Sequence, residues 1–158
     1  MNFLKFVMLL ALVLWIGGIF FFGGVMAPAV FAVLPTHDLA GKVVTRTLAH
    51  LHLIGIICGA VFLICSMIVA YVTKGSAQVF APRHIAIVAM IALTFVAQDV
   101  VGAKMNRIKD QIGVIDNVAV SDPRRVEFNR LHVWSTRLEG CILLLGVGVL
   151  YGTARRLS

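Results

Sequence analysis

The sequence predicts an all-α integral membrane protein, a four-helix bundle with up-down-up-down topology. Of its 158 residues, 60% are hydrophobic and only 13% are charged, and the mean hydropathy is +0.98. Soluble domains are closer to half apolar and a quarter charged. Four apolar segments are each long enough to cross a hydrocarbon layer of about 30 Å, which needs about 20 helical residues. These spans cover residues 3–34, 51–72, 85–103 and 133–152 of a single domain, residues 1–158.

The first span begins like a secretory signal, with Lys5 ahead of an apolar run. The run from Phe6 to Leu34 is much longer than the 7–15 residues of a signal's apolar core, so we expect a retained span. Pro28 lies inside it and removes one backbone hydrogen bond. We therefore expect a kink near Pro28.

Polar segments separate the spans, and we expect loops at 35–50, 73–84 and 104–132. The third connection is itself patterned, because Met105, Ile108, Ile112 and Ile115 recur at three- and four-residue spacing. That spacing is typical of one helical face. The third helix should therefore continue beyond the bilayer as an amphipathic helix.

The fourth helix should begin at Ser121-Asp122-Pro123, where an aspartate cap precedes a proline in the first turn. Nothing from Pro123 to Gly152 breaks the helical pattern, which gives about 45 Å of helix at 1.5 Å per residue. Helices 3 and 4 are thus expected to extend beyond the bilayer as an antiparallel hairpin. A hairpin lying flat on the membrane is the alternative.

Small residues mark expected helix contacts. Gly55–Gly59 and Gly148–Gly152 are GxxxG patterns, and Gly23-Gly24-Val-Met-Ala27 is a close relative. Such positions allow the close backbone approach through which helices associate in lipid. The three cysteines also lie in apolar runs without a CxxC pair, so we expect buried thiols rather than disulfides; they are Cys58, Cys65 and Cys141.

The distribution of charged residues indicates where the protein lies and which partners it meets. Although the net charge is +7, in a chain this apolar it indicates lysines and arginines beside anionic headgroups rather than nucleic acid. We expect the lipid bilayer as partner, with a homo-oligomer or a larger membrane complex as a further one, in the bacterial inner (cytoplasmic) membrane. Counting Lys and Arg favours the loop side as cytoplasmic, nine to five. The five on the terminal side are Lys5, Lys74, Arg83, Arg155 and Arg156.

Polar residues gather where helix 3 leaves the membrane and helices 2 and 4 enter it. His132, Ser135, Thr136 and Glu139 follow helical spacing and form one stripe. Helix 3 carries Gln98 and Asp99 about one turn from its exit, and His50 and His52 open the second span. Arg46 precedes them, and Arg137 should face away towards the headgroups. The sequence therefore predicts a polar pocket shared by three helices.

Asp99 and Glu139 are the only acidic residues within the spans. A charge deep in the bilayer costs about 2.5–3.5 kcal/mol on insertion scales, so we expect both to point inward towards a histidine or arginine. Structural pairing is one interpretation of this cluster. Another is a haem or transition-metal site, because neutral imidazoles with a carboxylate suit zinc, copper or iron. In that case His52 and His132 would bind the cofactor, and Asp99, Glu139 and His50 would be metal ligands.

Three stretches give the chain a resemblance to a known family: LWIGGIFFFGGVMAPAVFAVLP, AGKVVTRTLAHLHLIG and FNRLHVWSTRLEG. With them the chain resembles the domain-of-unknown-function 4149 family, which includes transmembrane protein 205. More distantly it is similar to CopD copper-resistance proteins and HemJ-type protoporphyrinogen oxidases, which implies copper handling or haem-linked redox chemistry. The HemJ type is expected to carry a functional histidine in its first helix. Residues 1–36 contain none, so we transfer no catalytic residue.

The resulting hypothesis is a binding or accessory protein whose polar intramembrane pocket holds a metal or haem. A membrane redox enzyme is the alternative, and transport of a small solute or metal through an oligomer is a third. Against transport, we expect the terminal half of each helix to be apolar, without ionisable groups that would continue a path.

Overall fold

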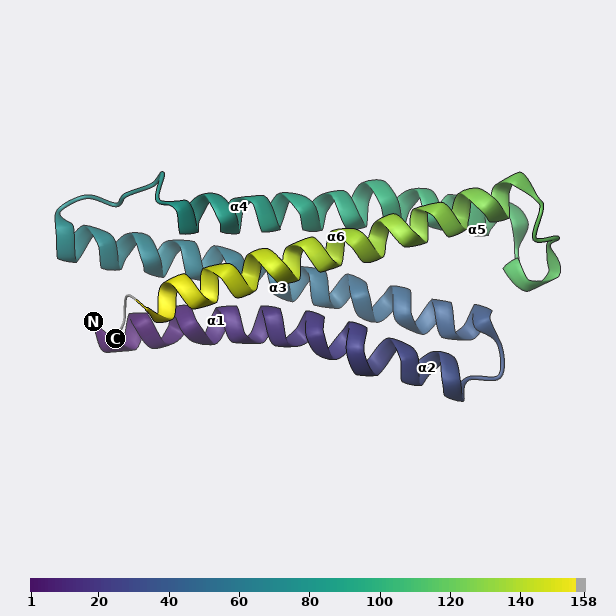
Figure 1. Cartoon of the computed structure of the whole chain (residues 1–158), viewed down its shortest axis with the longest axis horizontal. Coiled ribbons are helices and arrows are strands. Elements are labelled where there is room, and N and C mark those ends of the chain that lie inside the picture. The colour runs from purple at the N-terminus through teal and green to yellow at the C-terminus, as the bar shows by residue number, and fades with distance from the viewer. Residues whose placement is uncertain (156–158) are drawn as a thin grey trace.

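Four antiparallel helical spans make up the protein. The structure, a computed structural model, describes residues 1–155 apart from the side chain of Asp116, and this part of the chain contains no strand. The spans cover Asn2–Val33, His37–Lys74, Pro82–Ile112 and Pro123–Arg155, each long and apolar enough to cross a membrane. They run up, down, up and down, with both termini at one end (Figure 1). The predicted four-span fold is therefore confirmed. Arg156, which we counted among the basic residues of the terminal side, lies outside the described residues.

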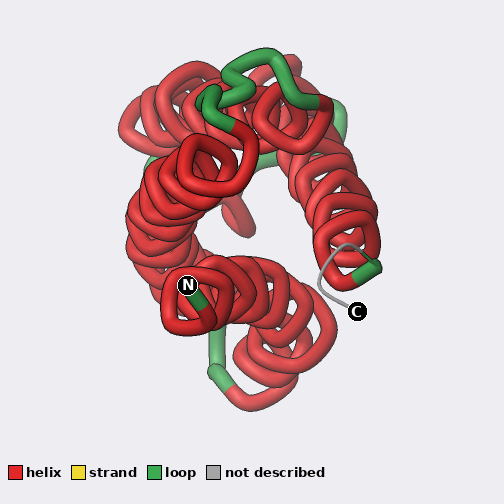
Figure 2. The backbone as a smooth tube through the Cα atoms, turned by 90° about the vertical axis from the view of Figure 1, so that its left-hand side faces the viewer, coloured by secondary structure: helices red, strands yellow, loops and turns green. Residues whose placement is uncertain are grey.

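Two of the spans contain a π-helical turn. The first consists of α1 (Asn2–Phe21), η1 (Phe22–Met26) and α2 (Ala27–Val33). The third consists of α4 (Pro82–Phe95), η2 (Val96–Gly102) and α5 (Ala103–Ile112). The second and fourth spans are the uninterrupted helices α3 (His37–Lys74) and α6 (Pro123–Ala154), and a short 3₁₀ turn, η3 (Ile115–Asn117), precedes α6. Viewed end-on, the spans surround a common axis (Figure 2).

The irregularity expected at Pro28 takes the form of the π turn η1. The N–H of Ala27 donates to the carbonyl of Phe22, five residues back. Proline lacks a backbone N–H, and its ring crowds the carbonyl four residues earlier. A wider turn directly before Pro28 accommodates both effects, as π turns inside α-helices do.

The polar loop predicted at 35–50 is wrong, because α3 begins at His37 and runs for 38 residues. Thr36 caps the helix by accepting a hydrogen bond from the N–H of Leu39 at 3.2 Å, and Asp38 lies in the first turn, where the helix dipole favours a negative charge. Residues 37–50 thus add about 21 Å of helix at 1.5 Å per residue. The second span therefore also extends beyond its apolar segment, as predicted only for the third and fourth.

The core lies in the half of the bundle nearer the termini. Its fully buried side chains come from all four spans and include Leu12, Trp15, Phe62, Ile87, Met90 and Ile142. Gly55 and Gly59 of α3 make room for Trp15: a Cβ at Gly55 would lie 2.7 Å from Trp15 Cε2, and one at Gly59 would lie 2.9 Å from Trp15 Cζ3. This predicted close contact is confirmed.

The other predicted small-residue contacts do not form among the described residues. A Cβ at Gly148, Gly152, Gly23 or Gly24 would meet nothing within 4 Å among the described residues. The prediction for the cysteines holds for Cys58 and Cys65, which are buried, but is wrong for Cys141, which is exposed. One face of α6 is therefore more open than its glycines and Cys141 predicted.

Candidate functional site

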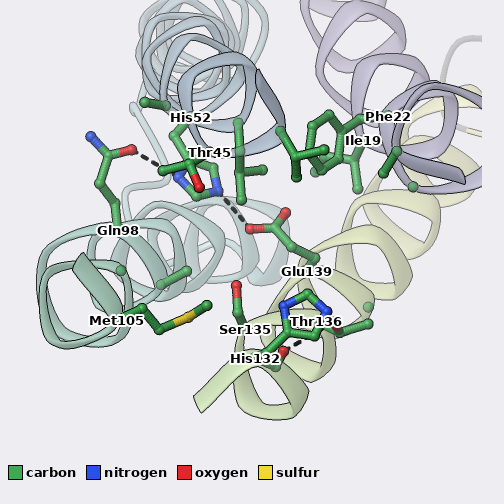
Figure 3. Close-up of a pocket in the computed structure, with 18 of the residues that line it drawn as sticks. Ile19, Phe22, Thr45, His52, Gln98, Met105, His132, Ser135, Thr136 and Glu139 are labelled. Atoms are coloured by element: carbon green, nitrogen blue, oxygen red, sulfur yellow. Dashed lines mark hydrogen bonds and ion pairs between the residues drawn. The ribbon is translucent and has the colours of Figure 1, made fainter. Parts of the chain in front are cut away.

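A cavity of about 720 Å³ lies between all four spans, at the end of the bundle opposite the termini, which we call the loop end (Figure 3). Much of its wall is apolar and includes Ile19, Phe22, Leu48, Met105 and Leu143. Polar side chains from three spans also line it; they include His52, Gln98, His132, Ser135, Thr136 and Glu139. The structure thus brings these six residues together around one cavity, as the sequence predicted.

His52 of α3 is at the centre of the polar groups. It is buried, and its Nε2 lies 2.5 Å from Oε1 of Glu139 on α6. Its Nδ1 lies 2.9 Å from the side-chain oxygen of Gln98 on η2. Because an amide oxygen only accepts, Nδ1 must carry a proton. Figure 3 shows the imidazole between these two partners.

One further proton lies between His52 and Glu139. It gives either an imidazolium beside a carboxylate or a neutral imidazole beside a carboxylic acid. In both forms the pair has no net charge, which suits a site within a span. The side chains of His52 and Glu139 are 5% and 14% exposed, so water screens the pair only weakly. The inward position predicted for Glu139 is therefore confirmed.

The second carboxylate oxygen of Glu139, Oε2, takes no part in the contact with His52. Oε2 is buried and has no hydrogen-bond partner among the described residues. A buried acceptor without a partner costs about 1–3 kcal/mol. Glu139 lines the cavity, so a donor that reaches Oε2 from the cavity would remove this cost.

The inward position predicted for Asp99 is wrong, although its carboxylate still interacts electrostatically with His52. Its side chain is exposed, and no hydrogen bond or ion pair joins it to another residue of the described part of the chain. Ala97 and Val101 occupy the buried face of η2. Asp99 lies two residues from each, nearly half a turn away, and so falls on the outer face. Its adjacent residue Gln98, rather than Asp99, meets His52.

Three further predicted residues lie outside the cavity wall. Arg46, His50 and Arg137 are exposed, and none of them lines the cavity. Nδ1 of His50 lies 2.8 Å from the carbonyl of Arg46 on its own helix. His132 lines the cavity but is itself exposed, and its backbone carbonyl accepts a hydrogen bond from the Thr136 hydroxyl at 3.1 Å.

The described residues do not assemble a metal site of the predicted kind. Among them, no group of three or more His, Cys, Asp or Glu side chains lies close enough to hold a metal ion. Both ring nitrogens of His52 are engaged, so it offers no free lone pair unless one of these contacts breaks. Cofactor binding by His52 and His132 stays a prediction.

A second polar cluster, which the sequence did not predict, lies at the end of the bundle nearer the termini. Ser66 and His84 are buried, with Oγ 2.7 Å from Nε2. Nδ1 of His84 lies 3.1 Å from the carbonyl of Gln78, and Nε of Arg83 donates to Ser66 Oγ at 2.8 Å. This cluster attaches the connection between α3 and α4 to the bundle, so the terminal half is not wholly apolar. The one hint was a serine within an apolar run.

Comparison with known proteins adds the family. A family model described as a domain of unknown function (DUF4149) matches residues 10–113, about two thirds of the chain. The matched range contains His52 and Gln98 and ends before α6, which carries Glu139. No curated protein and no solved structure gives a significant match. Because this match covers more than half of the chain, the chain belongs to the DUF4149 family.

Proposed function

We propose that this chain is a membrane-embedded binding protein whose cavity holds a largely apolar small molecule with a hydrogen-bond donor. The observation that carries the proposal is Oε2 of Glu139, a buried acceptor that has no partner among the described residues and belongs to a side chain lining a largely apolar cavity. A hydroxyl or an amine on the ligand would supply the missing donor. His52 holds the other carboxylate oxygen and keeps Glu139 in place.

The cavity has the size and lining of a small-molecule site. Its volume of about 720 Å³ is within the range of roughly 300–1,000 Å³ that is usual for such sites. On α6 its lining extends from His132 to Leu143, about 16 Å along the helix axis at 1.5 Å per residue. An alkyl chain or a small ring system fits these dimensions.

Packing on the terminal side of the cavity favours binding over transport. Trp15 lies against Gly55 and Gly59, beyond His52 towards the termini. Together with Phe62 and Ile87 it fills the bundle there, and all three side chains are fully buried. A ligand that enters at the loop end therefore meets a packed core.

Native mass spectrometry of the solubilised protein tests the proposal with three probes of equal chain length: dodecanol, dodecylamine and dodecane. We expect the alcohol and the amine to be retained in preference to dodecane, which has no donor. Glu139→Gln should abolish this preference, whereas Glu127→Gln, at a partly exposed glutamate of the same helix, should keep it. Equal retention of all three probes, or an unchanged preference in Glu139→Gln, refutes the proposal.

A metal or haem centre is the second candidate, supported by the position of His52 and His132 on one cavity. It requires His52 to release Gln98 or Glu139. Elemental analysis and an absorption spectrum of gently solubilised protein test it. A Soret band that disappears in His52→Ala or His132→Ala supports haem, and with it the redox alternative; colourless, metal-free protein refutes both.

The proposal also covers location and partners. Exposed apolar side chains on all four spans imply contact with lipid. We place the chain in the bacterial cytoplasmic membrane as a single four-span domain, with a further membrane chain beside it: a second copy or a larger complex. The support for such a partner is Asp99, an exposed carboxylate within an apolar span.

A further inference from the structure

Two opposite charges lie exposed on the outer surface of neighbouring spans without an ion-pair partner in the described part of the chain. One is Asp99 on η2, and the other is Arg137 on α6. The guanidinium of Arg137 lies 5.5 Å from the ring centre of Trp134, a residue of its own helix. Carboxylates and guanidinium groups within apolar spans are rarely left to face acyl chains, because such exposure is costly.

The two charges lie at nearly the same depth. Gln98 and Glu139 both contact His52, which places them at one level of the bundle. Asp99 follows Gln98 on the span that runs towards the loop end. Arg137 precedes Glu139 by two residues on the helix that starts there. At 1.5 Å per residue, both lie about 1.5–3 Å from that level, on the same side of it.

Each charge belongs to an exposed stripe whose residues alternate by three and four. Such a stripe is the seam along which one helix packs on another. On the third span all five residues of the stripe are exposed; they are Ile85, Val88, Ala92, Phe95 and Asp99. On α6 all six are exposed; they are Trp134, Arg137, Cys141, Leu144, Gly148 and Tyr151. Gly148 and Gly152 leave open space on this outer surface, which suits close approach of another helix.

We infer that the chain forms a two-fold dimer in which Asp99 of each copy pairs with the partner's Arg137. A two-fold axis along the membrane normal keeps every residue at its depth and forms each contact twice. Charges of opposite sign at one depth are therefore brought level with each other. The further membrane chain proposed above is then a second copy of this chain. The dimer does not depend on the ligand in the cavity.

Charge reversal in two differently tagged chains tests the dimer. Asp99→Arg gives a chain with two positive charges at these positions, and Arg137→Asp gives a chain with two negative charges. Neither variant has an opposite pair, within a chain or in its own dimer. Only a mixed dimer restores both pairs, so repair within a single chain is excluded as an explanation.

We expect the wild-type chain to dimerise in phosphatidylcholine vesicles, as measured by energy transfer between labelled copies. Each variant alone should lose dimer by about tenfold or more, because like charges then face each other. Co-expressed, the two variants should co-purify and regain wild-type energy transfer, which also shows that both fold. Asp110→Arg, at an exposed aspartate further along the same span, is the control and should dimerise as the wild type does.

Three results overturn the inference. Wild-type protein that is monomeric at every protein-to-lipid ratio refutes both the dimer and the association with a second copy. A wild-type dimer that both variants retain refutes only the Asp99–Arg137 contact. Variants that dissociate alone and fail to co-purify when mixed refute this contact as well. The ligand proposal stands or falls separately, on Glu139→Gln.

Discussion

Replacing His52 with leucine should destabilise the bundle more than replacing both members of its pair. His52→Leu removes the partner from Oε1 of Glu139, whose Oε2 already has none in the described part of the chain. Removing one member of a buried ion pair costs about 3–5 kcal/mol, because the other charge stays behind. Protonation of Glu139 in the variant relieves part of this cost. We therefore expect a loss near the lower end of the range, about 3 kcal/mol.

The double variant His52→Leu/Glu139→Leu removes the stranded carboxylate as well. Replacing a buried pair with apolar side chains of similar volume is often neutral or stabilising. Gln98 then loses its partner, at a cost of about 1–2 kcal/mol. The double variant should thus be more stable than His52→Leu alone, and the coupling energy of the two substitutions should be about 2 kcal/mol or more.

Unfolding in mixed detergent and dodecyl sulfate micelles measures this cycle for the wild type, His52→Leu, Glu139→Leu and the double variant. The matched control is the same cycle on Arg130 and Glu127, an ion pair of the same helix with side chains 67% and 38% exposed. Its coupling energy should stay below about 1 kcal/mol, as for other exposed pairs. If the costs of His52→Leu and Glu139→Leu add to within about 0.5 kcal/mol, the two side chains do not form the buried pair.

Three further predictions concern individual contacts. Hydrogen bonds from the Arg124 side chain and backbone lower the pKa of Asp122 to about 2 from 3.8. This cap therefore stabilises α6 above about pH 4 and is lost as the pH falls through about 2, so amide exchange in the first turn should differ between Asp122→Ala and wild type only at the higher pH. His84→Ala leaves buried polar groups unpaired, at about 1–3 kcal/mol, and limited proteolysis should cut the 75–81 connection faster. Gly55→Ala places a methyl group against buried Trp15 and should cost about 1–3 kcal/mol in thermal unfolding.

Hydropathy was sufficient to predict the four spans but not the full length of the helices. A window of apolar residues detects the part of a helix that crosses lipid. It therefore missed residues 37–50, where α3 is polar and continues outside the apolar segment. The sequence does contain the local start signal, Thr36 ahead of Asp38 and Leu39, and capping would have corrected the boundary.

The candidate site was predictable where the helix is regular. The stripe from His132 to Glu139 follows α-helical spacing along α6, and all four of its residues line the cavity. The inward position predicted for Asp99 failed for two reasons. Asp99 lies in a π turn, where α-helical spacing does not hold. Spacing along one helix also does not identify which neighbouring helix a residue faces. The contact between Ser66 and His84 was hidden for a related reason: it depends on the path of the loop that joins their helices.

Two identical glycine patterns show how the surroundings decide the use of a motif. Gly55 and Gly59 face Trp15, whereas a Cβ added at Gly148 or Gly152 would have no described residue within 4 Å. Gly148→Ala is therefore the matched control for Gly55→Ala, and it should leave the monomer unchanged or slightly more stable, because alanine favours a helix. In lipid, helices gain little from burying apolar surface, so an outward glycine pair contributes only when another helix approaches it. The Asp99–Arg137 dimer would place a second copy near this surface.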